Sequence, residues 1–233
     1  MKQFLGFALL PFLLFFPFTS KRLVATTPAE MTAEIVKKIE TRRGNWIAMK
    51  ADLHLYFLEG GHRAACRAEL AYQRLEERIL LKGYNAKEEL LFVFKTNDRN
   101  FEIYLPKQRK VYRGDIFTLE DSPDIESTLK PLDLYRALKP MAIPLPQTEI
   151  KNLEGGNISL RIMGMRQDKP YLARRILATK EGDVQVEIYY SFEEKPMTII
   201  RRSNFKENFA RRIVIKRKTR EQTLVFDRIE FFP

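Results

Sequence analysis

The sequence predicts an α+β domain built on one long, strongly curved antiparallel sheet with short helices on its concave side. Apolar and polar residues alternate at a period of two in successive segments from residue 46 to the C-terminus. Turns separate these segments at intervals of about ten residues, which is typical of antiparallel hairpins. Apolar residues recur at helical spacing in two other stretches, one before the first strand and one between residues 123 and 146.

Residues 1–25 are typical of a secretory signal peptide. Lys2 precedes an uncharged, mostly apolar run from Phe4 to Phe18, which is too short to span a bilayer comfortably. No good small-x-small cleavage site follows, so an uncleaved N-terminal membrane anchor is the alternative. No cysteine follows the run either, and we therefore expect an exported protein without a lipid anchor. The remaining residues, 26–233, are long enough for one sizeable core and are expected to form a single domain.

The first half of this domain is expected to be a helix followed by a meander. Thr27 is a candidate N-cap, and Gly44 ends an amphipathic pattern carried by Met31, Ile35, Val36 and Ile39. Strands are predicted over residues 46–57, 64–72, 78–84 and 89–95, with Gly60-Gly61 as the first turn. Residues 101–115 are expected to form two short strands around a basic turn. The absence of proline between Pro28 and Pro106 favours an uninterrupted sheet.

Residues 123–146 contain five prolines in 24 residues. Apolar residues there have a spacing that fits one or two short helices laid on the sheet: Ile125, Leu129, Leu132, Tyr135 and Leu138. Strands resume from Ile158 to the C-terminus, which gives about ten or eleven strands in all. Residues 184–192 show the cleanest alternation, and their apolar residues are expected to face the core.

The positive charge lies in the second half of the chain. The net charge is +11; residues 151–233 carry 18 basic and 11 acidic residues, whereas residues 26–150 carry 20 and 19. Because strands expose alternate side chains, we predict an outward basic patch of Arg202, Arg212 and Lys216 that meets anionic lipid headgroups or an acidic partner. An ordinary solubilising surface is one alternative. A nucleic-acid surface using Phe205 and Phe209 is another, and export argues against it.

Catalytic and metal-binding signatures are missing from the sequence. His54 and His62 flank a Gly-Gly turn without a metal-ligand pattern around them, and no Ser-His-Asp arrangement, G-x-S-x-G motif or phosphate-binding glycine loop occurs. The single cysteine, Cys66, lies on an apolar strand face, where a small buried residue is expected rather than a nucleophile. We therefore expect no enzyme activity, no metal and no cofactor.

The order of these elements resembles the outer-membrane lipoprotein carriers and receptors of the LolA and LolB type. The resemblance is carried by the signal peptide, the helix before "NWIAMKADLHLYF", the stretch "FKTNDRNFEIYLPKQRKVYRGD", the proline-punctuated segment and the final "LVFDRIEFF". It implies an incomplete antiparallel β-barrel with an N-terminal helix and short lid helices on its concave side. The chain lacks the acylated cysteine of the receptors, and its loop "NAKEE" is polar, so a soluble carrier or an uncharacterised relative fits better. The lid-holding arginine of the carriers has no matched position in this sequence.

The resemblance implies a monomeric, noncatalytic periplasmic carrier for the acyl chains of a lipoprotein or lipid. An inner-membrane releasing complex or another envelope partner and an anionic membrane surface are the implied further partners, and nucleic acid is not expected. The apolar strand faces and the helix supply the candidate cavity residues: Met49, Leu53, Leu55, Leu70, Phe92, Phe94, Ile103, Leu132, Leu138 and Ile188. The alternative is a structural or sensory envelope module of the same fold, whose concave side is filled by its own side chains.

Overall fold

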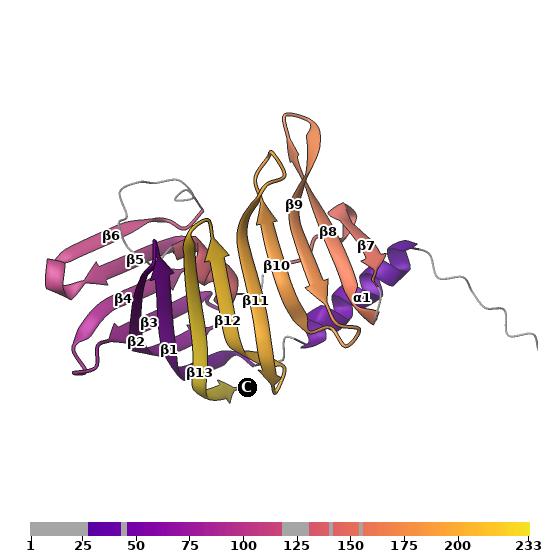
Figure 1. The fold of residues 1–233 in the computed structure, drawn as a ribbon. Helices are drawn as coiled ribbons and strands as arrows, with labels where there is room; N and C mark the ends of the chain where they lie inside the picture. Colours follow the sequence, from indigo (N-terminus) through magenta and orange to yellow (C-terminus); the bar gives the residue numbers. More distant parts are fainter. Residues whose placement is uncertain (1–27, 43–45, 118–130, 140–141, 154–155) are drawn as a thin grey trace, which may run out of the picture.

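A single 13-stranded antiparallel sheet dominates the computed structural model (Figure 1). The structure describes residues 28–42, 46–117, 131–139, 142–153 and 156–233. The predicted signal peptide and the part of the proline-rich segment that carries Ile125 and Leu129 lie outside these ranges. The α+β class and the one continuous sheet are confirmed.

The strands form two meanders that meet in the middle of the sheet. The first comprises β1 (Ala48–Glu59), β2 (His62–Gln73), β3 (Arg78–Tyr84), β4 (Leu90–Asn97), β5 (Asn100–Leu105) and β6 (Lys110–Asp115). The second comprises β7 (Thr148–Asn152), β8 (Ile158–Arg166), β9 (Lys169–Ala178), β10 (Val184–Tyr190), β11 (Pro196–Lys206), β12 (Phe209–Arg217) and β13 (Arg220–Phe232). Pairing of β1 with β13 joins them, so β6 and β7 are the two edges of an unclosed sheet.

The number of strands exceeds the predicted ten or eleven. The short edge strand β7 lies between the proline-rich segment and Ile158, where no strand is predicted from the sequence. Its five residues are too few to show a clear alternation, but they pair with β8 in register. Pairing with β8, rather than the β-propensity of its own residues, therefore explains why this segment forms a strand.

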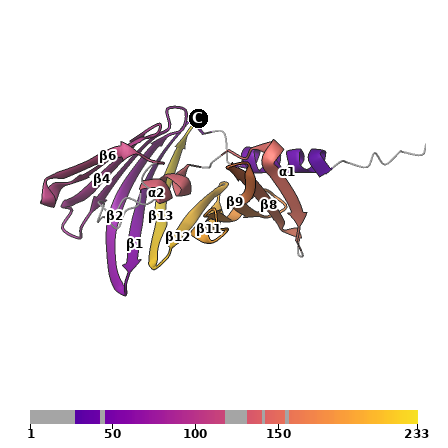
Figure 2. The ribbon, with the colours of Figure 1, turned by 90° about the horizontal axis from the view of Figure 1, so that it is seen from above.

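Two α-helices lie against the sheet. Helix α1 (Pro28–Arg42) packs beside the β7–β9 edge, and α2 (Pro131–Leu138) lies on the inner side of the bend between the two halves (Figure 2). Short 3-10 turns occur at η1 (Pro106–Gln108) and η2 (Leu145–Gln147). The N-terminal helix is confirmed, and at least one of the predicted short helices forms on the concave side.

The core divides into two apolar clusters. The larger one joins strands β1–β5 and β10–β13 to α2, with fully buried Leu53, Phe94 and Leu134 among its members. The smaller one packs Ile35 and Ile39 of α1 against β8 and β9. Concave side chains of β9, β10 and β11 that lie between these clusters include buried charged groups.

Close contact between α1 and the β9–β10 turn depends on Gly182, which has a φ of +96°. A Cβ at this position would lie 3.0 Å from the carbonyl carbon and oxygen of Lys38. Gly182→Ala should therefore lower the free energy of unfolding by about 1–3 kcal/mol, measured by urea denaturation. Gly156→Ala is the control, because Gly156 has a φ of +78° but its Cβ would meet only the Lys180 side chain at 3.7 Å. An equal loss of unfolding free energy in the two variants would mean that the contact between α1 and the β9–β10 turn does not contribute to stability.

Candidate functional site

Nine of the ten candidate cavity residues lie inside the bend of the sheet. All nine are at most 5% exposed: Met49, Leu53, Leu55, Leu70, Phe92, Phe94, Ile103, Leu132 and Leu138. Leu132 and Leu138 belong to α2, and eight of the nine, all but Leu132, are in the larger cluster. The structure thus brings these residues together, with α2 packed against the apolar concave surface.

Ile188 is the exception, because the prediction that its side chain faces the concave side was wrong. Glu187 and Tyr189 point to the concave side and are 1% and 7% exposed, whereas Ile188 is half-buried on the outer face. The reason is that the outer face of β10 is also apolar, while its inner face carries a carboxylate that charges from neighbouring strands neutralise. Period-two alternation shows which residues of a strand share a face. It does not show which face is buried when the buried face carries a charged residue.

Glu187 is the centre of a buried polar network that the sequence did not predict, here called the Glu187 network and made of Arg174, Glu187, Tyr189 and Arg202. Glu187 forms ion pairs with Arg174 of β9 and with Arg202 of β11, the latter at 2.9 Å between Nη1 and Oε2. The Tyr189 hydroxyl donates a hydrogen bond to Glu187 at 2.8 Å. Burial alone would raise the pKa of Glu187, but the two arginines and these hydrogen bonds lower it to about 2. Glu187 is therefore charged at neutral pH.

The Glu187 network also holds the C-terminal end of α2. The Arg202 guanidinium donates hydrogen bonds to the carbonyl oxygens of Arg136 and Ala137, at 3.4 and 3.3 Å. Carbonyl groups in the last turn of a helix lack intrahelical partners and attract cations. The Arg136 guanidinium in turn lies 4.0 Å from the centre of the Tyr189 ring.

Polar contacts attach α2 to the sheet in two further places. Near its N-terminus, Asp133 accepts a hydrogen bond from the Thr198 hydroxyl at 2.9 Å and contacts Arg217 at 3.5 Å. Just after its C-terminus, Lys139 pairs with Glu77 in the β2–β3 turn. The helix therefore connects both halves of the sheet through charged groups, while its apolar side chains fill the space between them.

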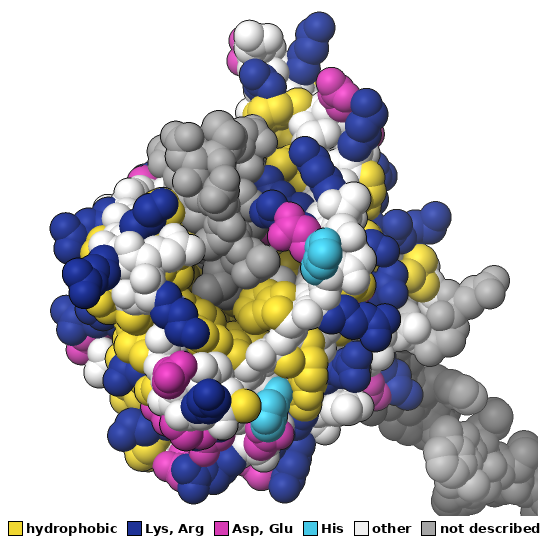
Figure 3. Space-filling view, turned by 60° about the vertical axis from the view of Figure 1, so that its left-hand side comes forward, with side chains coloured by type: hydrophobic (Ala, Val, Ile, Leu, Met, Phe, Trp, Pro, Cys, Tyr) yellow, Lys and Arg dark blue, Asp and Glu magenta, His cyan; other side chains and the backbone are white. Residues whose placement is uncertain are grey.

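A cavity of about 750 Å³, here called the β9–β11 cavity, opens next to the Glu187 network. Five basic residues from α2, β9, β12 and two turns line it: Arg136, Arg174, Lys195, Arg217 and Lys218. Aromatic residues line it as well: Tyr171, Tyr189, Tyr190 and Phe192. No acidic residue of the described chain is part of this lining. Figure 3 shows apolar side chains gathered in the hollow of the sheet and basic side chains around the visible rim.

The predicted basic patch is wrong at Arg202, which points inward into the Glu187 network. Arg212 pairs in register with Ser203, and Lys216 pairs with Ile199, so these two basic residues share the outer face. Arg201 pairs with Val214 on that same face and is exposed. The outer patch is therefore Arg201, Arg212 and Lys216. Sequence reasoning chose the wrong member of the Arg201-Arg202 pair because the inward residue is also charged.

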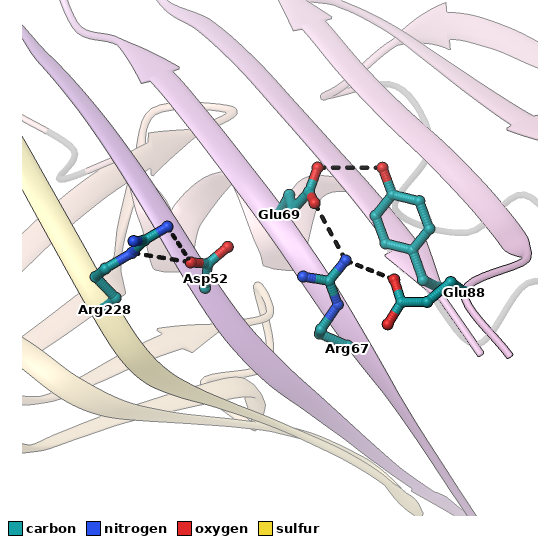
Figure 4. Close-up of polar contacts among 6 residues, drawn as sticks. Asp52, Arg67, Glu69, Glu88 and Arg228 are labelled. Carbon is teal, nitrogen blue, oxygen red and sulfur yellow. Dashed lines mark hydrogen bonds and ion pairs between the residues drawn. The ribbon is translucent and has the colours of Figure 1, made fainter. Parts of the chain in front are cut away.

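A second polar cluster lies on the outer face of β13, β1 and β2, where Asp52 and Glu69 are cross-strand neighbours (Figure 4). Two carboxylates side by side can act as an acid and a base in catalysis. Here Arg228 contacts Asp52 at 2.8 Å, and Arg67 contacts Glu69 at 3.2 Å. Each carboxylate is thus occupied by an arginine in a partly exposed ion pair, which favours a role in strand pairing.

Both histidines are exposed and the cysteine is buried, as the sequence predicts. His54 is exposed, and its Nδ1 lies 2.8 Å from Asp227 on the outer face. Cys66 is buried, and burial raises the pKa of its thiol to about 11, so the nucleophilic thiolate is disfavoured. Within the described ranges, no His, Cys, Asp and Glu residues gather into a group that could hold a metal ion. None of the helices in these ranges is long and apolar enough to cross a membrane.

Comparison with known proteins shows similarity at the level of structure. No protein-family model matches the sequence, and no curated protein matches it significantly. An outer membrane lipoprotein-sorting protein domain from Vibrio parahaemolyticus is similar, with a TM-score of 0.62 and 12% identity over 87% of this chain and 93% of that one. A LolA superfamily protein from Nitrosomonas europaea has a TM-score of 0.58 and 12% identity over 87% and 94%. A DUF1329 family protein from Desulfovibrio piger has a TM-score of 0.63 and 10% identity over 88% and 94%. The chain therefore has a LolA-like fold.

Proposed function

We propose that the protein is a noncatalytic carrier that binds the acyl chains of a lipoprotein or lipid on the concave side of its sheet, beneath α2. The observation that carries this proposal is the way α2 is held. Its apolar side chains cover an apolar concave surface, but its links to the strands are ion pairs and hydrogen bonds near its two ends. Displacing this eight-residue helix would expose a contiguous apolar surface while the sheet keeps its pairing.

Acyl chains are the ligand that such a surface suits best. Each methylene group moved from water into an apolar site contributes about 0.8 kcal/mol, so a chain of ordinary length could replace the contacts that α2 makes. The structure has α2 packed against the sheet, which corresponds to a closed state. No cofactor is needed for this activity.

Export to the periplasm is part of the proposal. The Phe4–Phe18 run supports it, and so does the fold, which is shared with a lipoprotein-sorting domain. In this setting a lipoprotein or lipid would be received from one envelope membrane and released at another.

Ligand retention tests the carrier proposal. We expect lipid to be found by mass spectrometry in extracts of the purified protein, and a fluorescent fatty-acid analogue to bind with micromolar affinity. Unlabelled fatty acid should displace the analogue. A packed structural or sensory module would retain no lipid and would not bind the analogue, because its apolar residues would stay in contact with one another.

Delivery of the bound lipid or lipoprotein to a membrane is expected to involve the outer basic patch. The protein should sediment with anionic but not neutral vesicles at low salt, and replacing Arg201, Arg212 and Lys216 with glutamine should remove this difference. The attraction should weaken at physiological salt, where charges are screened over about 8 Å. Glutamine at Lys50, Lys82 and Lys95 is the matched control and should leave sedimentation unchanged. These lysines lie on the outer face of the other half, where Lys82 pairs in register with Glu69 and Lys95 with Glu102. Equal loss in both triple variants would assign the binding to net charge alone.

A further inference from the structure

The β9–β11 cavity is a feature that an acyl-chain site does not explain. Its volume of about 750 Å³ is within the range of small-molecule sites. Its lining combines Arg136 of α2 with residues of strands β8 to β12 and of the turns that follow β10 and β12. We propose that it binds the anionic headgroup of a lipid whose acyl chains lie beneath α2, an inference that rests on the carrier function proposed above.

The charge around the cavity is positive. Counting Arg202 with the five basic lining residues gives six basic groups. Four carboxylates lie against these groups or next to them in the hairpin, Asp133, Glu187, Glu193 and Glu194. Among the residues that the structure describes, basic groups therefore outnumber carboxylates around this cavity. Asp133 and Glu187 are buried, whereas Glu193 and Glu194 lie in the exposed β10–β11 turn. None of the four lines the cavity, so an anion inside it would meet mainly guanidinium and ammonium groups.

The rim of the cavity suits the boundary between a polar headgroup and apolar chains. Phe192 is 52% exposed, and its ring packs edge-on against Tyr171 with 4.9 Å between ring centres. The Arg166 guanidinium lies 3.7 Å from the centre of the Phe192 ring. Aromatic rings of this kind are enriched where one side of a site is apolar and the other is wet.

Tyr189 connects the cavity to the apolar interior. It lines the β9–β11 cavity and also belongs to the larger apolar cluster that contains the candidate acyl-chain residues. Arg136, another lining residue, belongs to the helix that covers this cluster. A headgroup held in the cavity would therefore sit next to the place where chains enter beneath α2.

Titration calorimetry with short-chain lipids tests this inference on the full chain. The probes are dihexanoyl phosphatidylglycerol, the uncharged dihexanoylglycerol and inorganic phosphate. We expect the anionic lipid to bind roughly tenfold more tightly than the neutral one, since each basic group near an anionic headgroup contributes about 1 kcal/mol, or about fivefold, before screening. Lys195→Gln with Lys218→Gln should remove most of this preference and leave neutral-lipid binding unchanged. Both lysines are exposed, so these substitutions should not disturb the fold.

Lys151→Gln with Lys180→Gln is the matched control, because both of these lysines are exposed and neither lines the cavity. Equal affinity of the wild-type protein for the two lipids would overturn the headgroup site and leave the carrier function standing. Binding of inorganic phosphate with no preference for the anionic lipid would also overturn it, because the cavity would then be a site for a free anion. Failure of both lipids to bind would overturn the carrier function itself.

Discussion

Replacing Glu187 with glutamine should lower the free energy of unfolding by about 3–5 kcal/mol, because it leaves two inward-pointing arginines without their shared negative partner. Arg174 and Arg202 are only 8% and 11% exposed, so water cannot replace the lost carboxylate. Urea denaturation of the variant and the wild-type protein measures the loss. Glu193→Gln is the matched control, since Glu193 pairs with Lys195 in solvent, and it should leave the denaturation midpoint unchanged. If the Glu187→Gln protein were as stable as the wild-type protein, the Glu187 network would not contribute to the stability of the fold.

The same carboxylate makes stability depend on pH in the acid range. The pKa of Glu187 is lowered from 4.5 to about 2 in the folded state, where Arg174 and Arg202 offset the effect of burial. A depressed folded-state pKa stabilises the protein above the unfolded-state pKa, and this contribution is lost as the pH falls from about 4.5 toward 2. The wild-type protein should lose more stability over this interval than Glu187→Gln does. Parallel pH profiles of the two proteins would contradict this assignment.

Asp133→Leu should loosen α2 while most of the sheet remains ordered. Asp133 is buried and contacts both Thr198 and Arg217, so its removal takes one carboxylate from a buried ion pair under the helix, at a cost of about 3 kcal/mol. Hydrogen exchange of the α2 amides should become faster, whereas exchange in α1 should not change. In a carrier this variant should also take up a fluorescent fatty acid faster, because less free energy is needed to displace the helix.

A double variant separates loss of the ion pair from general damage. Arg217→Met together with Asp133→Leu removes both charges, and the double variant should be more stable than Asp133→Leu alone by about 1–3 kcal/mol. Additive losses from the two substitutions would indicate that Asp133 acts through its side-chain volume or through Thr198 alone.

Much of the fold follows from periodicity in the sequence. The alternation in β1 and β2 and the Gly60-Gly61 turn correctly predict the first hairpin, and the helical spacing of Ile35, Val36 and Ile39 predicts the buried face of α1. These features are local, so neighbouring residues determine them. The joining of β1 to β13 depends on residues far apart in sequence and has no local signal.

The polar part of the candidate site could not be predicted in the same way. Glu187 lies on the polar side of a clean apolar alternation, so the pattern predicts an exposed carboxylate. It is buried because Arg174 and Arg202 approach it from the two adjacent strands, and their inward direction is set by strand register. The single cue in the sequence is that basic residues occur on both strands that flank β10, which would suggest a partner for a carboxylate between them.

Photolabelling would show whether acyl chains bind inside the bend of the sheet. A fatty acid that carries a diazirine near the end of its chain would be bound to the purified protein, irradiated, and the labelled residues located by peptide mass spectrometry. The carrier account predicts labels on inward-facing residues of β1, β4, β5 and α2, such as Leu53, Phe94, Ile103 and Leu138, with loss of label when unlabelled fatty acid competes. Labels confined to the outer face, or labelling that unlabelled fatty acid does not reduce, would contradict it.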